Sequence, residues 1–186
     1  MMRAFVAVDA ISSGAISKLQ SEIISSTGWS TRDVKPVESS NFHFTIIFLG
    51  ELNNREAERI IEKLSTVQFE PFTISYSGVG AFPTPAAARI IWIGVNNDGA
   101  AKLTELAGKV VSALSQLGYR PDKPFSSHLT VFRVKARRPI SLGGLEKKYE
   151  GVSFATDVVE KVSLKKSDLT PSGPVYSNIY TVEAKK

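Results

Sequence analysis

Two short stretches of this chain, NFHFTIIFLG (residues 41–50) and FSSHLTVF (residues 125–132), contain its only two histidines, His43 and His128. Each histidine is followed two places later by threonine, and each lies in an otherwise apolar run. Short apolar runs bounded by Gly, Ser or Asn and rich in β-branched and aromatic residues predict β-strands. Two strands with the same polar pair are therefore the framework for the predicted fold and site.

Side chains at positions i and i+2 of a strand point to the same face of the sheet. His43 is therefore predicted to share a face with Thr45, and His128 with Thr130. The apolar residues between and after them are predicted to face the core: Phe44, Ile46 and Phe48 in the first strand, and Leu129 and Val131 in the second.

If the two strands face one another, they bring together two imidazoles and two hydroxyls. Histidine titrates near neutral pH, so one ring can accept a proton while the other donates one. Hydroxyl groups donate hydrogen bonds to oxygens on which negative charge develops. This combination is suited to hydrolysis or transfer at a phosphodiester. A structural histidine inside the core is the alternative for either ring alone.

A zinc site would need a third ligand, and Glu51 does not stand at an H-E-x-x-H or comparable spacing from the histidines. The expectation is therefore a site without metal or another cofactor. The GVG at Gly78–Gly80 lacks the G-x-G-x-x-G pattern, and neither a Walker A motif nor G-x-S-x-G occurs. These absences weigh against an ATP-dependent ligase.

Around the two motifs, hydrophobic periodicity and capping residues predict an α+β fold with mostly antiparallel sheet rather than a doubly wound parallel sheet. The predicted strands are residues 3–8, 42–49, 69–79, 89–95, 127–134, 152–154, 158–164 and 177–182, and the predicted helices are residues 13–26, 55–67 and 97–117.

The order strand, helix, His-x-Thr strand occurs in residues 3–49 and again in residues 89–134. This repetition indicates a duplication. We therefore expect residues 1–186 to form one domain of two pseudo-symmetric lobes.

The chain has 23 Lys and Arg against 18 Asp and Glu, a formal net charge of +5, which would help to attract a phosphate-bearing partner. Basic residues concentrate in RVKARR (133–138), which either binds such a partner or is solvated.

The chain has no cysteine, so disulfides and thiolate catalysis are excluded. No apolar run is long enough to span a membrane, and MMRAFVAVDAISSG predicts a first strand rather than a signal peptide. A cytoplasmic monomer is expected.

The two His-x-Thr motifs and the segments around them resemble those of the two-histidine (2H) phosphoesterases. Within these enzymes they resemble the RNA 2′,3′-cyclic phosphodiesterase branch, also called the 2′-5′ RNA ligase family. NFHFTIIFLGEL resembles the first H-x-T-x motif, SSHLTVFRVK the second, and FPTPAAARIIWIGV the Arg-x-x-Trp strand. The opening MRAFVAVD resembles the first strand, so the similarity covers nearly the whole chain. The terminal S-x-L-x-x-x-G-x-x-Y signature falls on Ser167, Leu169, Gly173 and Tyr176.

The resemblance implies a bilobal, duplicated LigT-like fold whose lobes each supply one His-x-Thr strand to a central cleft. It implies hydrolysis of 2′,3′-cyclic phosphate ends of RNA, such as those of tRNA fragments, to a 2′-phosphate. By the same resemblance His43 is the proton donor and His128 the proton acceptor, while Thr45 and Thr130 hold the non-bridging oxygens. Chemistry alone permits the two histidines to exchange roles.

Arg133 is a further candidate, as a contact to RNA phosphate. Strict alternation places it away from His128, so it reaches the site only if the strand bulges or ends there. The aromatic residues that could stack on a terminal base, with burial in the core as the alternative, are Phe5, Phe48, Tyr76 and Trp92.

Two alternative functions remain open from the sequence: reversible 2′-5′ RNA ligation and non-catalytic binding of RNA ends. The chain departs from the family pattern at Ser127 and Phe132, where the family often has proline and a small residue. Neither position belongs to the His/Thr pairs.

Overall fold

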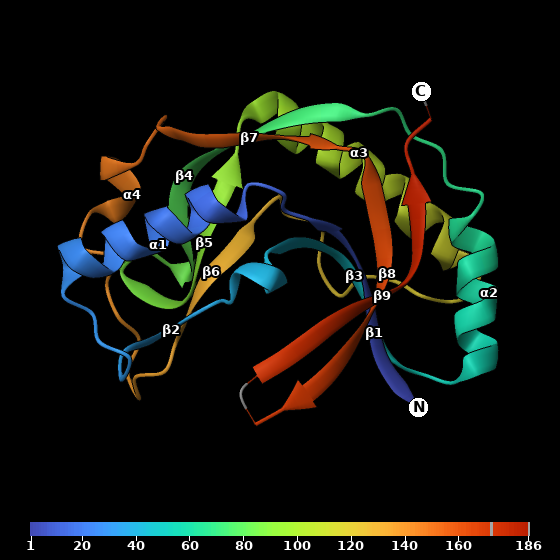
Figure 1. Ribbon diagram of the computed structural model, residues 1–186, viewed down its shortest axis with the longest axis horizontal. Coiled ribbons are helices and arrows are strands. Elements are labelled where there is room, and N and C mark those ends of the chain that lie inside the picture. The colour runs from blue at the N-terminus through green and yellow to red at the C-terminus, as the bar shows by residue number, and fades with distance from the viewer. Residues whose placement is uncertain (172, 186) are drawn as a thin grey trace.

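A computed structural model describes residues 1–171 and 173–185, and in these residues nine strands form two antiparallel sheets (Figure 1). The four-stranded sheet has the order β3-β1-β8-β9, and the five-stranded sheet the order β2-β6-β5-β4-β7. The strands are β1 Met2–Asp9, β2 Val34–Pro36, β3 His43–Leu52, β4 Phe72–Thr84, β5 Ala87–Val95, β6 Leu129–Val134, β7 Ser153–Val159, β8 Lys161–Thr170 and β9 Gly173–Glu183.

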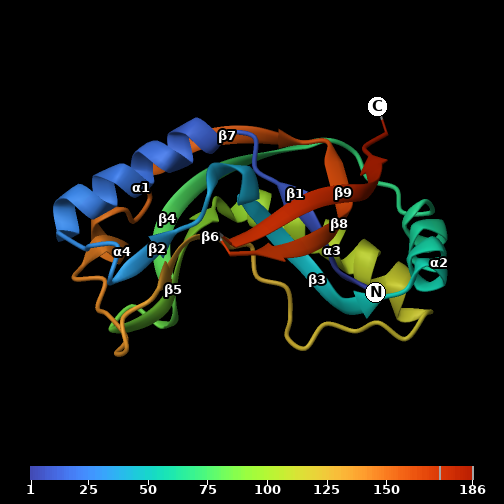
Figure 2. The ribbon, with the colours of Figure 1, turned by 60° about the horizontal axis from the view of Figure 1, so that its bottom comes forward.

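Helices lie at both ends of the molecule and behind its strands (Figures 1 and 2). One end has α1 and α4 beside the five-stranded sheet, and the other has α2, with α3 running behind the strands. The helices are α1 Ser13–Thr27, α2 Asn54–Leu64, α3 Asn97–Ser115 and α4 Leu145–Lys148, with a 3-10 turn at Ser39–Asn41. None of the helices described is long and apolar enough to cross a membrane.

Local sequence explains where α2 begins. Asn53 accepts a hydrogen bond from the backbone N–H of Glu56, and the Glu56 carboxylate accepts one from the N–H of Asn53. This reciprocal pair satisfies two of the N–H groups that a helix start leaves unpaired. Ala57, Ile60 and Leu64 then form the buried stripe of the helix.

Buried residues from both sheets form one hydrophobic core that also includes the inner stripes of the helices. On β1 the core residues are Ala4, Val6 and Val8, and the alternate residue Phe5 is buried outside this core. Each sheet therefore buries one face against helices and leaves the other face for the histidine pairs. The predicted α+β class with two antiparallel sheets is confirmed.

Several predicted boundaries differ from those in the structure. The second histidine strand begins at Leu129, not at Ser127, so His128 lies one residue before β6. β4 extends to Thr84, and the short β2 and α4 were not predicted. The predicted strand 152–154 overlaps the start of β7, and the predicted strand 158–164 spans the end of β7, the break at Glu160 and the start of β8.

A buried carboxylate, Asp157 on β7, joins the two sheets. It accepts hydrogen bonds from the backbone N–H groups of Ile11 (2.6 Å) and Ser12 (3.1 Å), which follow β1 of the other sheet. The hydroxyls of Ser12 and Tyr76 donate to the same carboxylate, the latter at 2.7 Å. Burial acts to raise the pKa of Asp157, but these hydrogen bonds outweigh it and hold the pKa below its ordinary value.

We expect Asp157→Asn to lower the free energy of unfolding at pH 7 by about 2–4 kcal/mol, because an amide cannot accept all four hydrogen bonds. Since the folded-state pKa is depressed, the contribution is present above the unfolded pKa of about 3.9 and is lost as the pH falls through the folded pKa. Urea unfolding at pH 7 and pH 3 measures the difference, which should shrink in acid. Asp122→Asn, at an exposed position, is the control. Equal stability of Asp157→Asn and wild type at pH 7 would contradict this.

Candidate active site

The first histidine strand contains a β-bulge directly after its motif. In the β1–β3 pair, Val6 is opposite Ile47 and Ala7 is opposite Thr45, so Ile46 has no partner of its own. Ile46 and Ile47 are consecutive and both buried, and the next residue, Phe48, returns to the face that carries His43. The prediction that Phe48 faces the core is therefore wrong: its side chain is 72% exposed.

The second histidine strand has a bulge at the equivalent position. In the β5–β6 pair, Ile91 is opposite Phe132 and Trp92 is opposite Thr130, which leaves Val131 unpaired. Val131 and Phe132 are both buried. Arg133 therefore returns to the Thr130 face and is exposed. The sequence places Arg133 near the site only if the strand bulges or ends there, and the strand does bulge.

A buried side chain supports this second bulge. The carbonyl oxygen of Val131 accepts a hydrogen bond from Nε2 of Gln20 at 2.7 Å and another from the backbone N–H of Val37 at 2.9 Å. Gln20 lies on α1 and is only 8% exposed. Gln20 and Val37 thus satisfy the backbone carbonyl of the residue that has no partner on β5.

Both imidazole rings are oriented in the same way by the backbone. Nδ1 of His43 lies 2.7 Å from the carbonyl oxygen of Asn41, and Nδ1 of His128 lies 2.9 Å from that of Ser126. A carbonyl oxygen can only accept, so Nδ1 carries a proton in each ring. Nε2 is then the nitrogen that gains or loses a proton. In His43 it lies 3.0 Å from Oγ1 of Thr45.

Two aromatic rings hold each imidazole in place. His43 packs against Phe5 and Tyr176, with ring centroids 5.1 Å and 5.3 Å away, and these two rings also contact each other at 4.9 Å. His128 meets the edges of Phe82 and Trp92, at 4.9 Å and 6.4 Å.

This packing affects the acidity of both rings. Burial lowers the pKa of His43, and the positive charges of Lys165 and Arg133 act in the same direction. The hydrogen bond to Asn41 and the carboxylate of Asp9 oppose this shift. Burial also lowers the pKa of His128, against the hydrogen bond to Ser126. Both rings are therefore more acidic as imidazolium ions than free histidine.

The two motifs lie close together although they belong to different sheets. β3 and β6 contact one another. Arg133 on β6 is near enough to lower the pKa of His43 and to oppose the rise that burial causes in the pKa of Tyr176. Arg133 of one sheet thus lies near His43 of the other, and the bulge puts Arg133 on the same face of β6 as Thr130.

The four aromatic candidates from the sequence have different positions. Tyr76 is fully buried and donates to Asp157, so it belongs to the core. Phe5 is 2% exposed and supports His43, and Trp92 packs on His128. Of the four, Phe48 alone offers a largely exposed ring, 6.0 Å from that of Phe5.

A charged network lies beside His43 and was not predicted. Lys165 is 6% exposed, and its Nζ donates to Asp9 at 2.7 Å and to Asn178 at 2.6 Å. Asp9 is directly opposite His43 in the β1–β3 pair. No spacing in the sequence indicates this network, because its members come from three strands.

Gly80 is a second feature that motif searching missed. It is opposite Trp92 in the β4–β5 pair, and a Cβ atom at Gly80 would lie 2.3 Å from Cζ2 of the indole. The ring therefore lies flat over this glycine, with its Nε1 buried and without a hydrogen-bond partner in the described chain. A glycine inside a strand often marks such a close approach, and this was the available signal.

Asn41 links the site to the β8–β9 hairpin. Its carbonyl accepts from His43, and its Nδ2 donates to the carbonyl of Pro174 at 2.9 Å. In residues 1–171 and 173–185, no three His, Asp or Glu side chains are grouped so that they could hold a metal ion.

The sequence of the chain matches a known family. The family model of the LigT-like phosphoesterases matches residues 13–92 and, a second time, residues 93–176. The chain belongs to this family.

Individual relatives are similar over nearly the full length. The chain is 44% identical over 184 residues to the RNA 2′,3′-cyclic phosphodiesterase of Archaeoglobus fulgidus, covering 98% of this chain and 100% of that one. It is 35% identical to the protein of the same name from Methanothermobacter thermautotrophicus, covering 96% of both chains.

Solved structures agree with the fold. A structure from Thermus thermophilus has a TM-score of 0.76 at 26% identity, covering 98% of this chain and 97% of the other. Escherichia coli LigT, solved with 3′-AMP, has a TM-score of 0.77 at 18% identity, covering 100% and 99%.

We expect Gly80→Ala to destabilise the protein by about 1–3 kcal/mol, because the added methyl must displace the Trp92 ring. His128, in contact with that ring, should show a changed NMR titration, while the His43 titration stays as in wild type. With two histidines in the chain, both curves can be followed separately. The control is Gly108→Ala on α3, where a Cβ meets nothing within 4 Å and the change should be neutral or stabilising. An unchanged His128 titration in Gly80→Ala would refute the packing argument.

Proposed function

We propose that this protein hydrolyses the 2′,3′-cyclic phosphate at the 3′ end of RNA and leaves a 2′-phosphate. Its membership of the LigT-like phosphoesterases and the names of its relatives, at 44% and 35% identity over almost the whole chain, support this activity. The observation that carries the proposal is the matched pair of histidines, each with Nδ1 bound to a carbonyl and Nε2 left to exchange a proton.

In the proposed reaction His128 accepts a proton from water through Nε2 as the water oxygen bonds to phosphorus. The bond from phosphorus to the 3′-oxygen breaks, and Nε2 of His43 gives its proton to that oxygen. Each turnover leaves His43 neutral and His128 protonated, and exchange with solvent restores them. Chemistry alone would permit the reverse roles, and the resemblance of the motifs to the 2H phosphoesterases favours this order.

Thr45 and Thr130 donate hydrogen bonds to the non-bridging phosphate oxygens in this proposal. Without substrate, protonated Nε2 of His43 donates to Oγ1 of Thr45 over 3.0 Å, so the threonine hydroxyl hydrogen is free for the phosphate. In the reaction the Nε2 proton passes to the 3′-oxygen instead. Arg133, which lies on β6, then binds a phosphate oxygen, and its positive charge stabilises the anionic transition state. No metal takes part in these steps.

We also propose that the two lobes arose by duplication and act as one domain. The equivalent bulges after Thr45 and Thr130 support this. We further propose that the protein is a cytoplasmic monomer that acts on RNA ends such as those of tRNA fragments. Reversible 2′-5′ ligation would use the same groups in reverse, with an RNA hydroxyl in place of water. Non-catalytic binding of RNA ends would not require two rings with titratable nitrogens in matched settings.

We expect turnover of an oligonucleotide with a 2′,3′-cyclic phosphate in the presence of EDTA, with a 2′-phosphate as the product in ³¹P NMR. His43→Ala and His128→Ala should each lower kcat by about 10²- to 10⁴-fold, the usual contribution of one acid or base. Thr66→Ala, at an exposed position two residues after the end of α2, is the control for Thr45→Ala. Loss of turnover in EDTA, or near-normal kcat in either histidine variant, would refute the mechanism.

A bell-shaped pH profile is also expected. The active form has one ring protonated and the other neutral, and burial lowers the pKa of both. The optimum of kcat/KM should therefore lie on the acidic side of 6.5, the ordinary pKa of histidine. The optimum of kcat should lie at higher pH, because the bound phosphate anion stabilises the imidazolium form. A kcat/KM that keeps rising above pH 8 would contradict the assignment.

A further inference from the structure

The positive charge of this chain is concentrated in two short segments, residues 31–35 and 133–138. Together they hold six of the 23 basic residues and one of the 18 acidic residues, Asp33. The remaining residues carry 17 charges of each sign, so these two segments account for the whole formal excess of +5. Such segregation differs from the mixed charge of an ordinary solvated surface.

The fold brings the two segments together. The carbonyl of Asp33 accepts hydrogen bonds from the backbone N–H groups of Lys135 (2.7 Å) and Ala136 (3.1 Å). Nζ of Lys135 donates to the carbonyl of Thr31 at 3.0 Å. The two turns therefore form one unit, although about a hundred residues separate them in sequence.

A further arginine holds the second turn from the other side. Arg89 on β5 donates to the carbonyls of Ala136 and Arg137, both at 2.8 Å. This fork fixes the backbone from which Arg137 and Arg138 project. Asp33 is the acidic residue of these two segments. Its carboxylate accepts hydrogen bonds from the backbone N–H and the hydroxyl of Ser30, at 2.8 and 2.7 Å.

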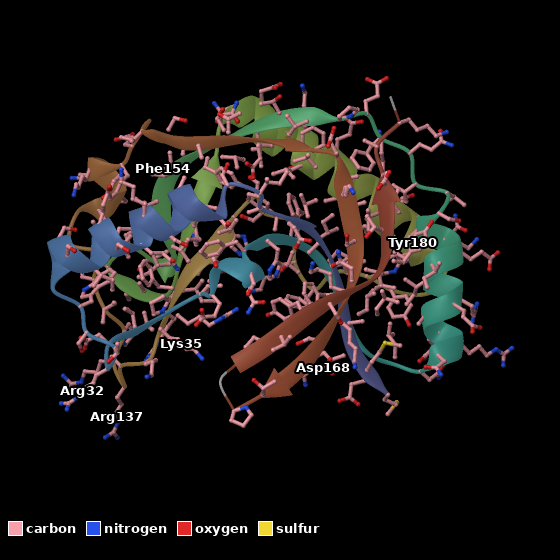
Figure 3. The ribbon with its side chains drawn as sticks, in the orientation of Figure 1. Arg32, Lys35, Arg137, Phe154, Asp168 and Tyr180 are labelled. Carbon is pink, nitrogen blue, oxygen red and sulfur yellow. The ribbon has the colours of Figure 1, made fainter. Side chains whose placement is uncertain are left out.

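The charges form a row that starts at the proposed site. Lys35 on β2 is directly opposite Arg133 on β6, so both side chains lie on the same face of the sheet. Figure 3 shows Arg32 and Arg137 side by side at the end of the molecule, pointing outward, with Lys35 nearer its middle. Arg32, Lys35, Arg137 and Arg138 form what we call the basic ridge, and all four are exposed.

We propose that the basic ridge binds the phosphate backbone of the RNA strand on the 5′ side of the reacting nucleotide. This rests on the proposed function: because the cyclic phosphate is at the 3′ terminus, all other phosphates of the strand lie on its 5′ side. The strand leaves the site past Arg133, crosses Lys35, and runs along Arg32 and Arg137. The ridge discriminates by RNA length and not by base sequence, since phosphate contacts carry no sequence information.

The test compares two double variants with the same change in net charge. Arg32→Gln/Arg137→Gln alters the ridge, and Arg55→Gln/Arg59→Gln removes two exposed arginines from α2, at the opposite end of the molecule (Figure 1). Binding of a 5′-labelled 12-nucleotide RNA with a 2′-phosphate end is measured by fluorescence anisotropy from 50 to 500 mM salt. Hydrolysis of a 2′,3′-cyclic mononucleotide and of a 12-nucleotide substrate is measured in parallel.

The ridge variant should bind the 12-nucleotide RNA roughly 10- to 100-fold more weakly at 50 mM salt, and the slope of log K against log salt should fall by about 1.4, the value for two lost contacts to a single strand. Its kcat/KM for the cyclic mononucleotide should equal that of wild type, because that substrate has no 5′ phosphates. The α2 variant should match wild type in all three measurements.

Equal salt slopes for the two variants would overturn the ridge proposal. The proposal would also be overturned if wild type bound phosphatidylserine vesicles through the ridge while the ridge variant kept the RNA affinity of wild type. The surface would then serve a membrane. If wild type hydrolysed neither the cyclic mononucleotide nor the 12-nucleotide substrate, the proposed function would be overturned instead. The binding measurement would still decide about the ridge, because it uses the product end and needs no turnover.

Discussion

The β-bulge after each His-x-Thr pair is the constraint on which the site depends. A regular strand shows every second side chain to one face, so a group five residues after the histidine would point to the core. One extra residue in each strand reverses this and turns Phe48 and Arg133 toward the histidines. The cost lies in the unpaired backbone: a buried carbonyl without a partner costs about 1–3 kcal/mol. Gln20 and Val37 remove that cost at Val131, so a polar residue of α1 is kept inside the core to support a strand of the active face.

The two bulges have the same geometry and present different chemistry. On β3 the residue returned to the face is an exposed phenylalanine beside Phe5, and on β6 it is an arginine opposite Lys35. An aromatic ring is suited to a base, and a guanidinium group to a phosphate. A terminal nucleotide bound between the motifs would therefore be oriented, with its base toward β3 and the rest of its strand toward β2. A duplicated frame can in this way bind an asymmetric substrate.

The parts of this structure that could be predicted are those that depend on local periodicity. The alternation around His43 gave the strand and the shared face with Thr45, and the capping residues gave the start of α2. The bulges could not be predicted in the same way, because a bulge is defined by the partner strand and not by the bulged one. Strict alternation consequently put Phe48 in the core, and it placed Arg133 on the wrong face. The contacts of Asp157 with Ser12 and of Lys165 with Asp9 join residues about 150 positions apart, and no local pattern indicates them.

The charges around His43 connect these features to catalysis. Lys165 and Asp9 form an ion pair beside the ring and act on its pKa in opposite directions, so they partly cancel. Burial and Arg133 then favour the neutral ring when the site is empty. A phosphate anion that binds Arg133 compensates its charge and adds a negative charge near Nε2, and both effects stabilise the imidazolium form. Proton uptake by His43 is in this account coupled to substrate binding, so the proposed acid is charged when a leaving oxygen is present to receive its proton. In the proposed binding mode the same arginine would connect the reacting phosphate to the basic ridge, because Arg133 is opposite Lys35 and acts on the pKa of His43.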